Sequence, residues 1–501
     1  MNRDILKLAW PVFVGQLAVM LNGVIDTIMA GRLSAVDLAA VGLGASVYIS
    51  VYIGLMGIVL ALSPIVAQHY GAGRFEEIAL EVRQAVWLAV LLAVPGCIAL
   101  GWSGLWFALS DPPPEVAAVA GPYLWATAAG LPAALLFRVF HALSNAVARP
   151  KAVMLINLAG LTLKVPLNTL FMHGWQVGDT TIVPALGGAG CGVATAIILW
   201  LSVLLAIVAL RVEPLYRELA VTGGGALGRP DRARLRALLA LGLPIGASYM
   251  VEVTSFTFMA LFLARLGATT AASHQIAANL AALVYMLPLA LATATSVLVA
   301  QSIGAGRTLE ARGRAWAGLR IALGCALLIG TALFVWRHRL AGLYTGDASL
   351  VAATVPLLAL VAAFQLFDAG QVMCSFILRA YRITTMPMVV YVFSLWGIGL
   401  GGGWWLAFVF GTSEHEWAPA VAGARGFWTA AGASLAVAAA GLAVILARVW
   451  RAEQRRRDVG TGSAVETPGD AAARPPAGAL AQPPDEATAR PSGATDRNRS
   501  R

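Results

Sequence analysis

Twelve long stretches with few or no charged residues constrain the fold of this chain more than any other feature of its sequence. They lie near residues 8–31, 38–64, 85–109, 120–144, 152–174, 188–210, 238–263, 270–299, 315–336, 350–378, 386–410 and 424–447. An α-helix needs about 20 residues to cross a hydrocarbon core about 30 Å thick, and each stretch has at least that length. Only 12% of the residues are charged and 59% are hydrophobic, which leaves little surface to show to water. The sequence therefore predicts an all-α integral membrane protein with twelve transmembrane helices.

An eight-residue motif that occurs twice divides the chain into two copies of one unit. AQHYGAGR spans Ala67–Arg74 and AQSIGAGR spans Ala300–Arg307. The register continues outside the motif without a gap, in the pairs Pro11 and Pro244, Arg32 and Arg265, Tyr52 and Tyr285, and Glu77 and Glu310. We interpret each octapeptide as a turn at the cytoplasmic end of a helix. Glycine permits the turn, and arginine keeps the loop on the inner face.

Each copy contains six spans, so both copies enter the membrane from the same side. We therefore expect two parallel six-helix repeats related by a pseudo-twofold axis along the membrane normal. The N-lobe would cover 1–212 with helices 1–6, and the C-lobe would cover 238–447 with helices 7–12. A cytoplasmic linker over 213–237 would join them. Residues 448–501 are rich in Pro, Ala, Gly and Arg without an apolar period, which predicts a disordered cytoplasmic tail.

Lysine and arginine indicate which side of the membrane each loop faces, because basic loops stay cytoplasmic. With the N-terminus inside, the inside loops hold Arg3, Lys7, Arg74, Arg83, Arg149, Lys151, the arginines from Arg211 to Arg236, Arg307, Arg312, Arg314, Arg320, Arg379 and Arg382. The outside loops hold only Arg32, Arg265, Arg337, Arg339 and Arg425. We expect a multi-pass protein of the cell's inner (plasma) membrane with both termini cytoplasmic. This asymmetry and the basic tail account for the net charge of +10, which gives no reason to expect a nucleic-acid partner.

Among the ionisable residues inside the predicted spans we single out Asp26, Arg138, Lys164, Glu252 and Asp368. A charge at a helix centre costs about 2.5–3.5 kcal/mol on insertion scales, so such residues usually line a cavity or have a partner. Arg138 is near the inner end of its span and is interpreted as structural. The three acids lie deeper, where a carboxyl can take a proton, bind a bare cation, face an organic cation, or be locked by hydrogen bonds between helices. In the repeat register Asp26 falls on Met259 and Glu252 on Val19, so the acids are not copies of one another.

Four sequence segments in order resemble one transporter family. Asp26 sits in GVIDTIMAGRLSAVDLAAVGLG, the fifth and sixth spans contain KVPLNTLFMHG and LGGAGCGVATA, Glu252 sits in VEVTSFTFMALF followed by HQIAANLAALVYMLPLAL, and Asp368 sits in FQLFDAGQVMCSFILRAY. On a duplicated twelve-span frame these segments resemble the NorM-type branch of the multidrug and toxic compound extrusion (MATE) transporters. The resemblance covers roughly residues 5–447 and omits the tail.

The resemblance implies a V-shaped pair of six-helix bundles that exports lipophilic, cationic drugs or dyes by alternating access, in antiport with H+ or Na+. It implies that Asp26 belongs to a coupling site in the first lobe, and that Glu252 and Asp368 form a cation site in the second. Supporting polar residues are expected at Asn168, Lys164, Gln275 and Gln371. Candidate aromatic surfaces for a cationic ligand are Phe256, Phe258, Phe262, Tyr285, Phe364 and Phe367, most of which we expect to be packing residues. No cofactor is expected, no metal beyond a possible Na+ at Glu252 and Asp368, and no partner beyond the drugs and the lipid bilayer, so that the protein is expected to be a monomer.

Two positions depart from the family pattern. Lys164, in KVPLN, stands where relatives commonly have asparagine, and Ile383, in RAYRIT, stands where relatives often have an acid. Ile383 lies in a loop and is expected to have little effect. Lys164 would act as a built-in counter-ion if it lay beside Asp26, which would disfavour Na+ at the first-lobe site and favour proton coupling.

Other classes of protein fit the sequence less well. A lipid-linked oligosaccharide flippase of the same superfamily is the main alternative; it would carry several cationic residues along its cavity, whereas acids and bases are about equal within these spans. A major facilitator transporter would usually show a G-x-x-x-D-R/K-x-G-R-like loop after the second span, and AQHYGAGRFEE is not that motif. An intramembrane enzyme would need a set such as HExxH or GxSxG, which is missing, and His274 is interpreted as a packing residue. The cysteines, Cys97, Cys191, Cys325 and Cys374, lack CxxC spacing and are expected to be reduced.

Overall fold

The chain is almost entirely helical in the computed structural model, which describes residues 1–177, 179–219, 228–412, 415 and 417–462. The first half contains α1 (Asn2–Leu33), α2 (Ala35–Val59), α3 (Leu62–Gly71), α4 (Phe75–Gly101), α5 (Ser103–Ser110), α6 (Pro114–Ala146), α7 (Pro150–His173), β1 (Trp175–Val177), β2 (Thr180–Val183) and α8 (Ala189–Val212). After α9 (Pro214–Glu218), the second half contains α10 (Arg232–Ala264), α11 (Ala268–Gly304), α12 (Thr308–Tyr344), α13 (Ala348–Ala380), α14 (Thr385–Tyr391), the π-helix η1 (Val392–Gly402), α15 (Gly403–Phe408), the 3-10 turn η2 (Phe410–Thr412), α16 (Ala418–Val421) and α17 (Ala424–Gly462).

Within the described residues, 12 helices or helix pairs have the length and apolar composition needed to cross a membrane. This agrees with the twelve spans predicted from the sequence. The third predicted span is misplaced at its start, since α4 begins at Phe75 rather than near residue 85. Glu77 and Glu81 made the first turns of α4 read as loop, but both carboxylates are paired in the folded chain. At the other end, α17 runs past Ala447 to Gly462, and the remainder of the predicted tail, 463–501, lies outside the described residues.

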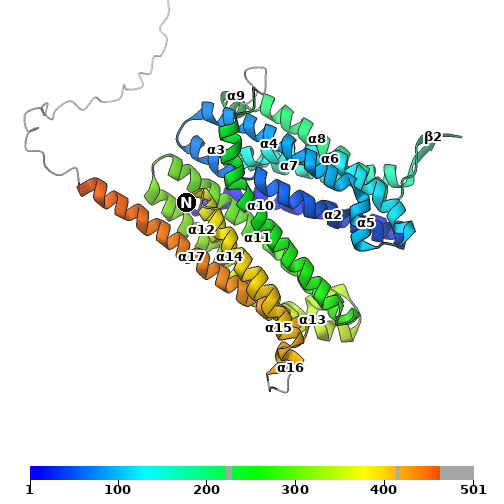
Figure 1. Ribbon diagram of the computed structural model, residues 1–501. Coiled ribbons are helices and arrows are strands. Elements are labelled where there is room, and N and C mark those ends of the chain that lie inside the picture. Colours follow the sequence, from blue (N-terminus) through cyan, green and yellow to red (C-terminus); the bar gives the residue numbers. More distant parts are fainter. Residues whose placement is uncertain (178, 220–227, 413–414, 416, 463–501) are drawn as a thin grey trace, which may run out of the picture. The chain divides into compact units, whose positions relative to one another are not determined.

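Each half packs as a helical bundle around its own long central helices. In the first half α6 contacts α2, α4 and α8, while α7 packs between α1 and α8. In the second half α13 packs against α11 and α12, and α10 lies along α14 and η1. The blue-to-cyan helices of the first half and the green-to-orange helices of the second group separately in Figure 1. The repeat predicted from the octapeptides has a structural counterpart, because α2 and α4 pack against α6 in the first bundle as α11 and α12 pack against α13 in the second.

The two halves meet along helices at the start of each repeat. α2 packs against α10, α1 against α11, and α3 against α11. Glycines allow the close approach of α2 and α10: a Cβ added to Gly57 would lie 2.5 Å from the Cα of Gly246, and one added to Gly242 would lie 2.4 Å from the carbonyl oxygen of Ile58. The backbones of the two halves therefore touch directly where α2 packs against α10.

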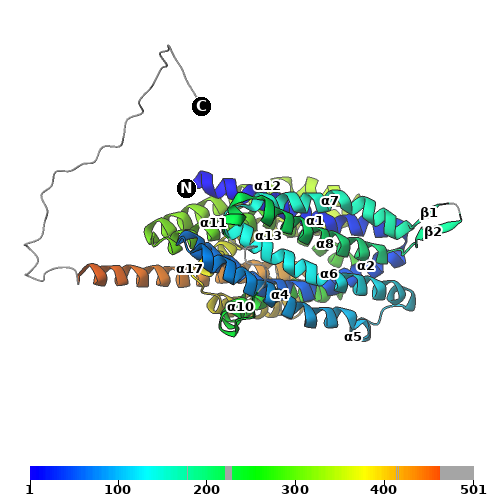
Figure 2. The same ribbon diagram turned by 90° about the horizontal axis from the view of Figure 1, so that it is seen from above.

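A β-hairpin between α7 and α8 was not predicted from the sequence. The segment between α7 and α8 forms a short antiparallel hairpin, in which Trp175 pairs with Val183 and Val177 with Thr180. The hairpin projects beyond the ends of these two helices (Figure 2). Its Trp, Val and Ile side chains favour strands, but three or four residues per strand are too few to register as a pattern.

Candidate functional site

The first candidate site surrounds Asp26, two turns before the C-terminal end of α1. Asp26 is only 8% exposed, and its Oδ1 lies 2.9 Å from Nζ of Lys164. Asn168 donates a hydrogen bond from Nδ2 to the same oxygen at 2.7 Å. Lys164 and Asn168 are four residues apart in sequence on α7, a spacing that puts both side chains on one helix face. Lys164 thus lies beside Asp26, which is the condition under which the sequence predicts a built-in counter-ion.

Lys164 is held inside the bundle from two sides. Its side chain does not extend to the membrane surface, because the residue is 1% exposed. Besides Asp26, Nζ donates to Oγ1 of Thr195 on α8 at 2.6 Å, and Thr195 in turn donates to the carbonyl of Cys191 at 2.8 Å. Thr195 was not identified from the sequence, since a threonine in an apolar span gives no signal of its own. A buried ion pair of this kind is stable only while both partners and their hydrogen bonds are present.

Asn168 has one polar side-chain atom without a hydrogen-bond partner among the described residues. Its Oδ1 is buried without a hydrogen-bond partner, while Nδ2 donates to Asp26. A carboxylate can only accept, whereas a protonated carboxyl also donates. Rotation of the Asn168 amide would turn its free oxygen toward Asp26, so this one side chain can serve both protonation states.

The second candidate site is built on α13, with contributions from α10 and from the end of α14. Asp368 is 5% exposed and accepts a hydrogen bond from Nε2 of Gln371 at 2.9 Å. The hydroxyl of Tyr391 donates to Oε1 of Gln371. Tyr391 was missed by the sequence analysis, because it ends α14 just before η1, and a run of π-helix cannot be foreseen from hydropathy.

Glu252 approaches the same site from α10. Its carboxyl is hydrogen-bonded by Tyr285 of α11 and interacts electrostatically with Asp368 and with Arg379. The two acids thus come from different helices into one neighbourhood. Asp368 accepts from a neutral amide, in contrast to the ammonium that contacts Asp26, while Glu252 also interacts with the Arg379 guanidinium.

Arg379 corrects one expectation. The distribution of basic residues predicts a cytoplasmic loop at this position, but Arg379 lies in the last turn of α13 and is 8% exposed. Its guanidinium donates to the hydroxyl of Tyr249 at 3.0 Å and lies 4.4 Å from the ring centroid of Phe376. Arg138 of α6 is held in a similar way, by the hydroxyl of Tyr52 at 2.8 Å. Aromatic partners on neighbouring helices therefore keep both arginines within the bundles.

Several predicted site residues make their contacts with groups other than the acids. Gln275 is exposed, and its hydrogen bond runs to Asn279 on its own helix at 3.4 Å. Phe256 and Phe364 pack edge-on against Trp428, with ring centroids 6.4 and 5.7 Å away, which makes them parts of an aromatic cluster in the second bundle. Phe367 and Phe258 are 38% and 44% exposed and keep free ring surface.

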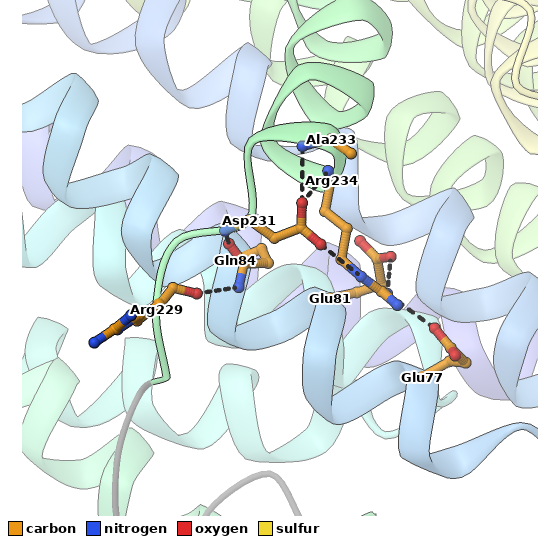
Figure 3. Close-up of polar contacts among 7 residues, drawn as sticks. All are labelled: Glu77, Glu81, Gln84, Arg229, Asp231, Ala233 and Arg234. Carbon is orange, nitrogen blue, oxygen red and sulfur yellow. Dashed lines mark hydrogen bonds and ion pairs between the residues drawn. The ribbon is translucent and has the colours of Figure 1, made fainter.

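A third polar cluster joins the halves at the start of α10 (Figure 3). Ligand atoms of His69, Glu77 and Glu81 lie close enough together to hold a cation. The guanidinium of Arg234 already contacts both carboxylates, at 2.8 Å to Glu77 and 2.7 Å to Glu81. Because Arg234 already contacts both carboxylates, we assign this cluster to the contact between α4 and α10 and not to a metal.

Known proteins match the chain in two parts that correspond to its two halves. The family model MatE matches the chain twice, over residues 11–170 and 244–405. A probable multidrug resistance protein NorM of Aromatoleum aromaticum is 42% identical over 423 residues, which cover 84% of this chain and 89% of that protein. The multidrug resistance protein PmpM of Pseudomonas aeruginosa is 35% identical over 456 residues, covering 90% and 92%.

Solved structures share the fold at low identity. A multidrug resistance MATE family transporter in an outward-facing conformation superposes with a TM-score of 0.79 at 20% identity, covering 90% of this chain and 97% of that one. The eukaryotic MATE transporter AtDTX14 gives a TM-score of 0.77 at 19% identity, covering 89% and 95%.

Proposed function

The chain belongs to the multidrug and toxic compound extrusion (MATE) family, in its NorM-type branch, and is a multidrug efflux transporter; we propose that it expels lipophilic organic cations in exchange for protons. The observation that carries the choice of ion is the Asp26 site. One carboxylate oxygen receives both the Lys164 ammonium at 2.9 Å and the Asn168 amide at 2.7 Å. Na+ would have to displace a covalently tethered cation from that oxygen, whereas a proton only has to neutralise the carboxylate.

The proposed exchange uses the groups around Asp26 in both protonation states. When a proton from outside binds Asp26, the ion pair breaks and Lys164 keeps its hydrogen bond to Thr195. Asn168 can then turn its unpaired oxygen to accept from the protonated carboxyl. Release of the proton on the inner side restores the pair. Each state therefore has hydrogen-bond partners within the site, which a group that cycles between them requires.

We propose that the acids of the second half form the site that binds the coupling cation or proton in exchange for the drug. Two buried carboxyls in one neighbourhood are tolerable when they share a proton or a cation. Asp368 is buried and Glu252 is half-buried in the same neighbourhood, with Tyr285 and Gln371 as neutral partners. A lipophilic cation is favoured by the same negative charge, and the exposed ring of Phe367 beside Asp368 in the sequence offers a surface for it.

The test of coupling is transport of ethidium by the purified protein in liposomes, with one gradient imposed at a time. A proton gradient alone should drive ethidium accumulation against its concentration, and a Na+ gradient alone at equal pH should not. The variant Asp26→Asn serves as the matched control, because it keeps the volume of the side chain and removes its titration. Accumulation driven by Na+ alone in the unmodified protein would contradict proton coupling.

The chain is a multi-pass membrane protein, and we propose for it the inner membrane, a monomeric state and cytoplasmic termini. Residues 1–212 and 238–447 would form two lobes, joined by 213–237, that alternate in exposing the site to either side. Single cysteines placed at Asn2 and in 463–501 should react with an impermeant maleimide only after the cells are opened. Labelling in intact cells would contradict the orientation.

A further inference from the structure

The two octapeptides meet each other where α3 and α11 end. A Cβ added to Gly71 would lie 1.9 Å from the carbonyl oxygen of Gln301, and one added to Gly304 would lie 1.9 Å from that of Gln68. Real Cβ atoms do not come that close to an oxygen, so the two backbones touch at positions that only glycine can fill. The contact is reciprocal, because the glycine of each octapeptide packs against the glutamine backbone of the other.

The glutamines of the motif extend the same reciprocity to two further helices. Nε2 of Gln68 donates to the carbonyl of Ala380 at 2.8 Å, and Nε2 of Gln301 donates to the carbonyl of Ala146 at 2.7 Å. Ala380 and Ala146 are the last residues of α13 and α6, where helix carbonyls have no partner within the helix. Each octapeptide therefore caps a helix of the opposite half.

The two glycines of each motif do different work. Gly73 and Gly306 have φ of +68° and +72° and no neighbour within 4 Å of an added Cβ, so they serve the turn, as expected from the sequence. Gly71 and Gly304 serve the contact between the halves, which the interpretation as turns alone did not include.

An ion pair reinforces one side of this contact. Arg234 at the start of α10 bridges to Glu77 and Glu81 on α4, across the two halves (Figure 3). In the repeat register the corresponding positions of the second copy are Glu310 and Arg314, which pair with each other within α12 at 2.5 Å. The octapeptide contact is thus two-sided and the ion pair one-sided.

We propose that the paired octapeptides form a clasp, made of Gln68, Gly71, Gln301 and Gly304 with the carbonyls of Ala146 and Ala380, which closes the cytoplasmic end of the interface and opens once in each transport cycle. The inference rests on the proposed alternation of the two lobes. A drug entering from the cytoplasm has to pass between the halves, so a contact that joins them at this end has to separate. Backbone contacts and single amide hydrogen bonds suit this role, since the freed groups can bind water when the halves part.

The test measures the distance between the two halves at this end. Spin labels are attached to cysteines at Glu76 and Leu309, which are exposed and correspond in the repeat, after Cys97, Cys191, Cys325 and Cys374 have been replaced. Gly71→Ala and Gly304→Ala should lower the population with the short distance about tenfold and abolish ethidium efflux, because a methyl group prevents closure. Gln68→Met and Gln301→Met keep the side-chain length, remove the donor and should change the population in the same direction by less.

Matched controls separate the clasp from general effects of helix glycines. Gly42→Ala on α2 and Gly324→Ala on α12 add a methyl group that meets no atom within 4 Å, and should leave distance and efflux unchanged. A short distance retained in both clasp variants would overturn the proposal, and so would normal efflux by variants whose distance has lengthened. If the unmodified protein did not export ethidium, the proposed function would fail, while the distances would still decide whether the clasp exists.

Discussion

The acid sites of the two halves differ in how their charge is met, although the halves share one fold. Asp26 in the first half has an ammonium and an amide on one oxygen. Asp368 in the second half has the amide of Gln371, which is held in turn by the Tyr391 hydroxyl. The octapeptides, by contrast, make the same contact twice. Duplication has thus kept the residues that join the halves alike, while the residues that handle charge have diverged.

Removing charge from the second-half site should have the largest effect on ethidium efflux. Glu252→Gln or Asp368→Asn should each lower ethidium efflux about a hundredfold, equal to about 2.7 kcal/mol, because the remaining acid loses the partner with which it shares a cation. Efflux is measured in cells that lack other pumps, with membrane insertion checked by the amount of folded protein after extraction. Glu115→Gln, at an exposed position, is the matched control. Normal efflux by both variants would leave the second half without a coupling role.

Replacing Lys164, the ammonium of the first-half site, tests the difference between the two acid sites most directly. Lys164→Asn should let a Na+ gradient drive efflux, because the Asp26 oxygens no longer hold an ammonium. The measurement is ethidium transport in liposomes under separate Na+ and proton gradients. If the variant and the unmodified protein depend on the same ion, Lys164 only supports the packing of α7.

Lys164→Met provides the contrast to that substitution. It removes the charge without supplying a hydrogen bond, and it leaves the Asp26 carboxylate buried and unpaired. Loss of one partner of a buried pair costs about 3–5 kcal/mol, so the melting temperature in detergent should fall well below that of Lys164→Asn. Equal melting temperatures would show that the pair contributes nothing to stability.

A smaller effect is expected at the second contact of Lys164. Thr195→Val keeps the shape of the side chain and removes the oxygen that accepts from Nζ at 2.6 Å. A hydrogen bond to a charged group contributes about 1.5–3 kcal/mol, so stability should fall by that order while some efflux remains. Thr162→Val is the control, since Thr162 is exposed on α7 and bonds only to its own helix among the described residues. No difference between the two variants would remove Thr195 from the site.

The smallest effect is expected at Tyr391. Tyr391→Phe removes the hydroxyl that orients Gln371, and a neutral hydrogen bond contributes about 0.5–1.5 kcal/mol. Efflux should fall tenfold or less, as measured by initial rates, and Gln371→Leu should lower it further because Asp368 then loses its donor. A larger loss of efflux in Tyr391→Phe than in Gln371→Leu would contradict the view that Tyr391 acts on Asp368 through Gln371.

The frame of the molecule could be predicted from the sequence, because spans and repeats depend on local composition. The contact of Lys164 with Asp26 could also be expected, since the family pattern places the two segments side by side. The position of Arg379 could not, because its burial depends on Tyr249 from another helix and on the ring of Phe376. The start of α4 was missed for a similar reason, as the partner of Glu77 and Glu81 comes from α10. From the sequence alone, a charged residue is expected to be exposed unless it has a partner. A partner that is distant in the sequence leaves no local pattern by which its position could be predicted.

The reciprocal contact of the octapeptides also bears on how such a chain can arise. An interface in which residue i contacts j and residue j contacts i is isologous, the kind that two identical subunits form about a twofold axis. A single six-span unit carrying one octapeptide would hold both halves of this contact, so two copies could pair before any fusion joined them. In such a homodimer one glycine substitution would be felt twice. In the fused chain the two positions are free to change separately, and the sequence still has glycine at both.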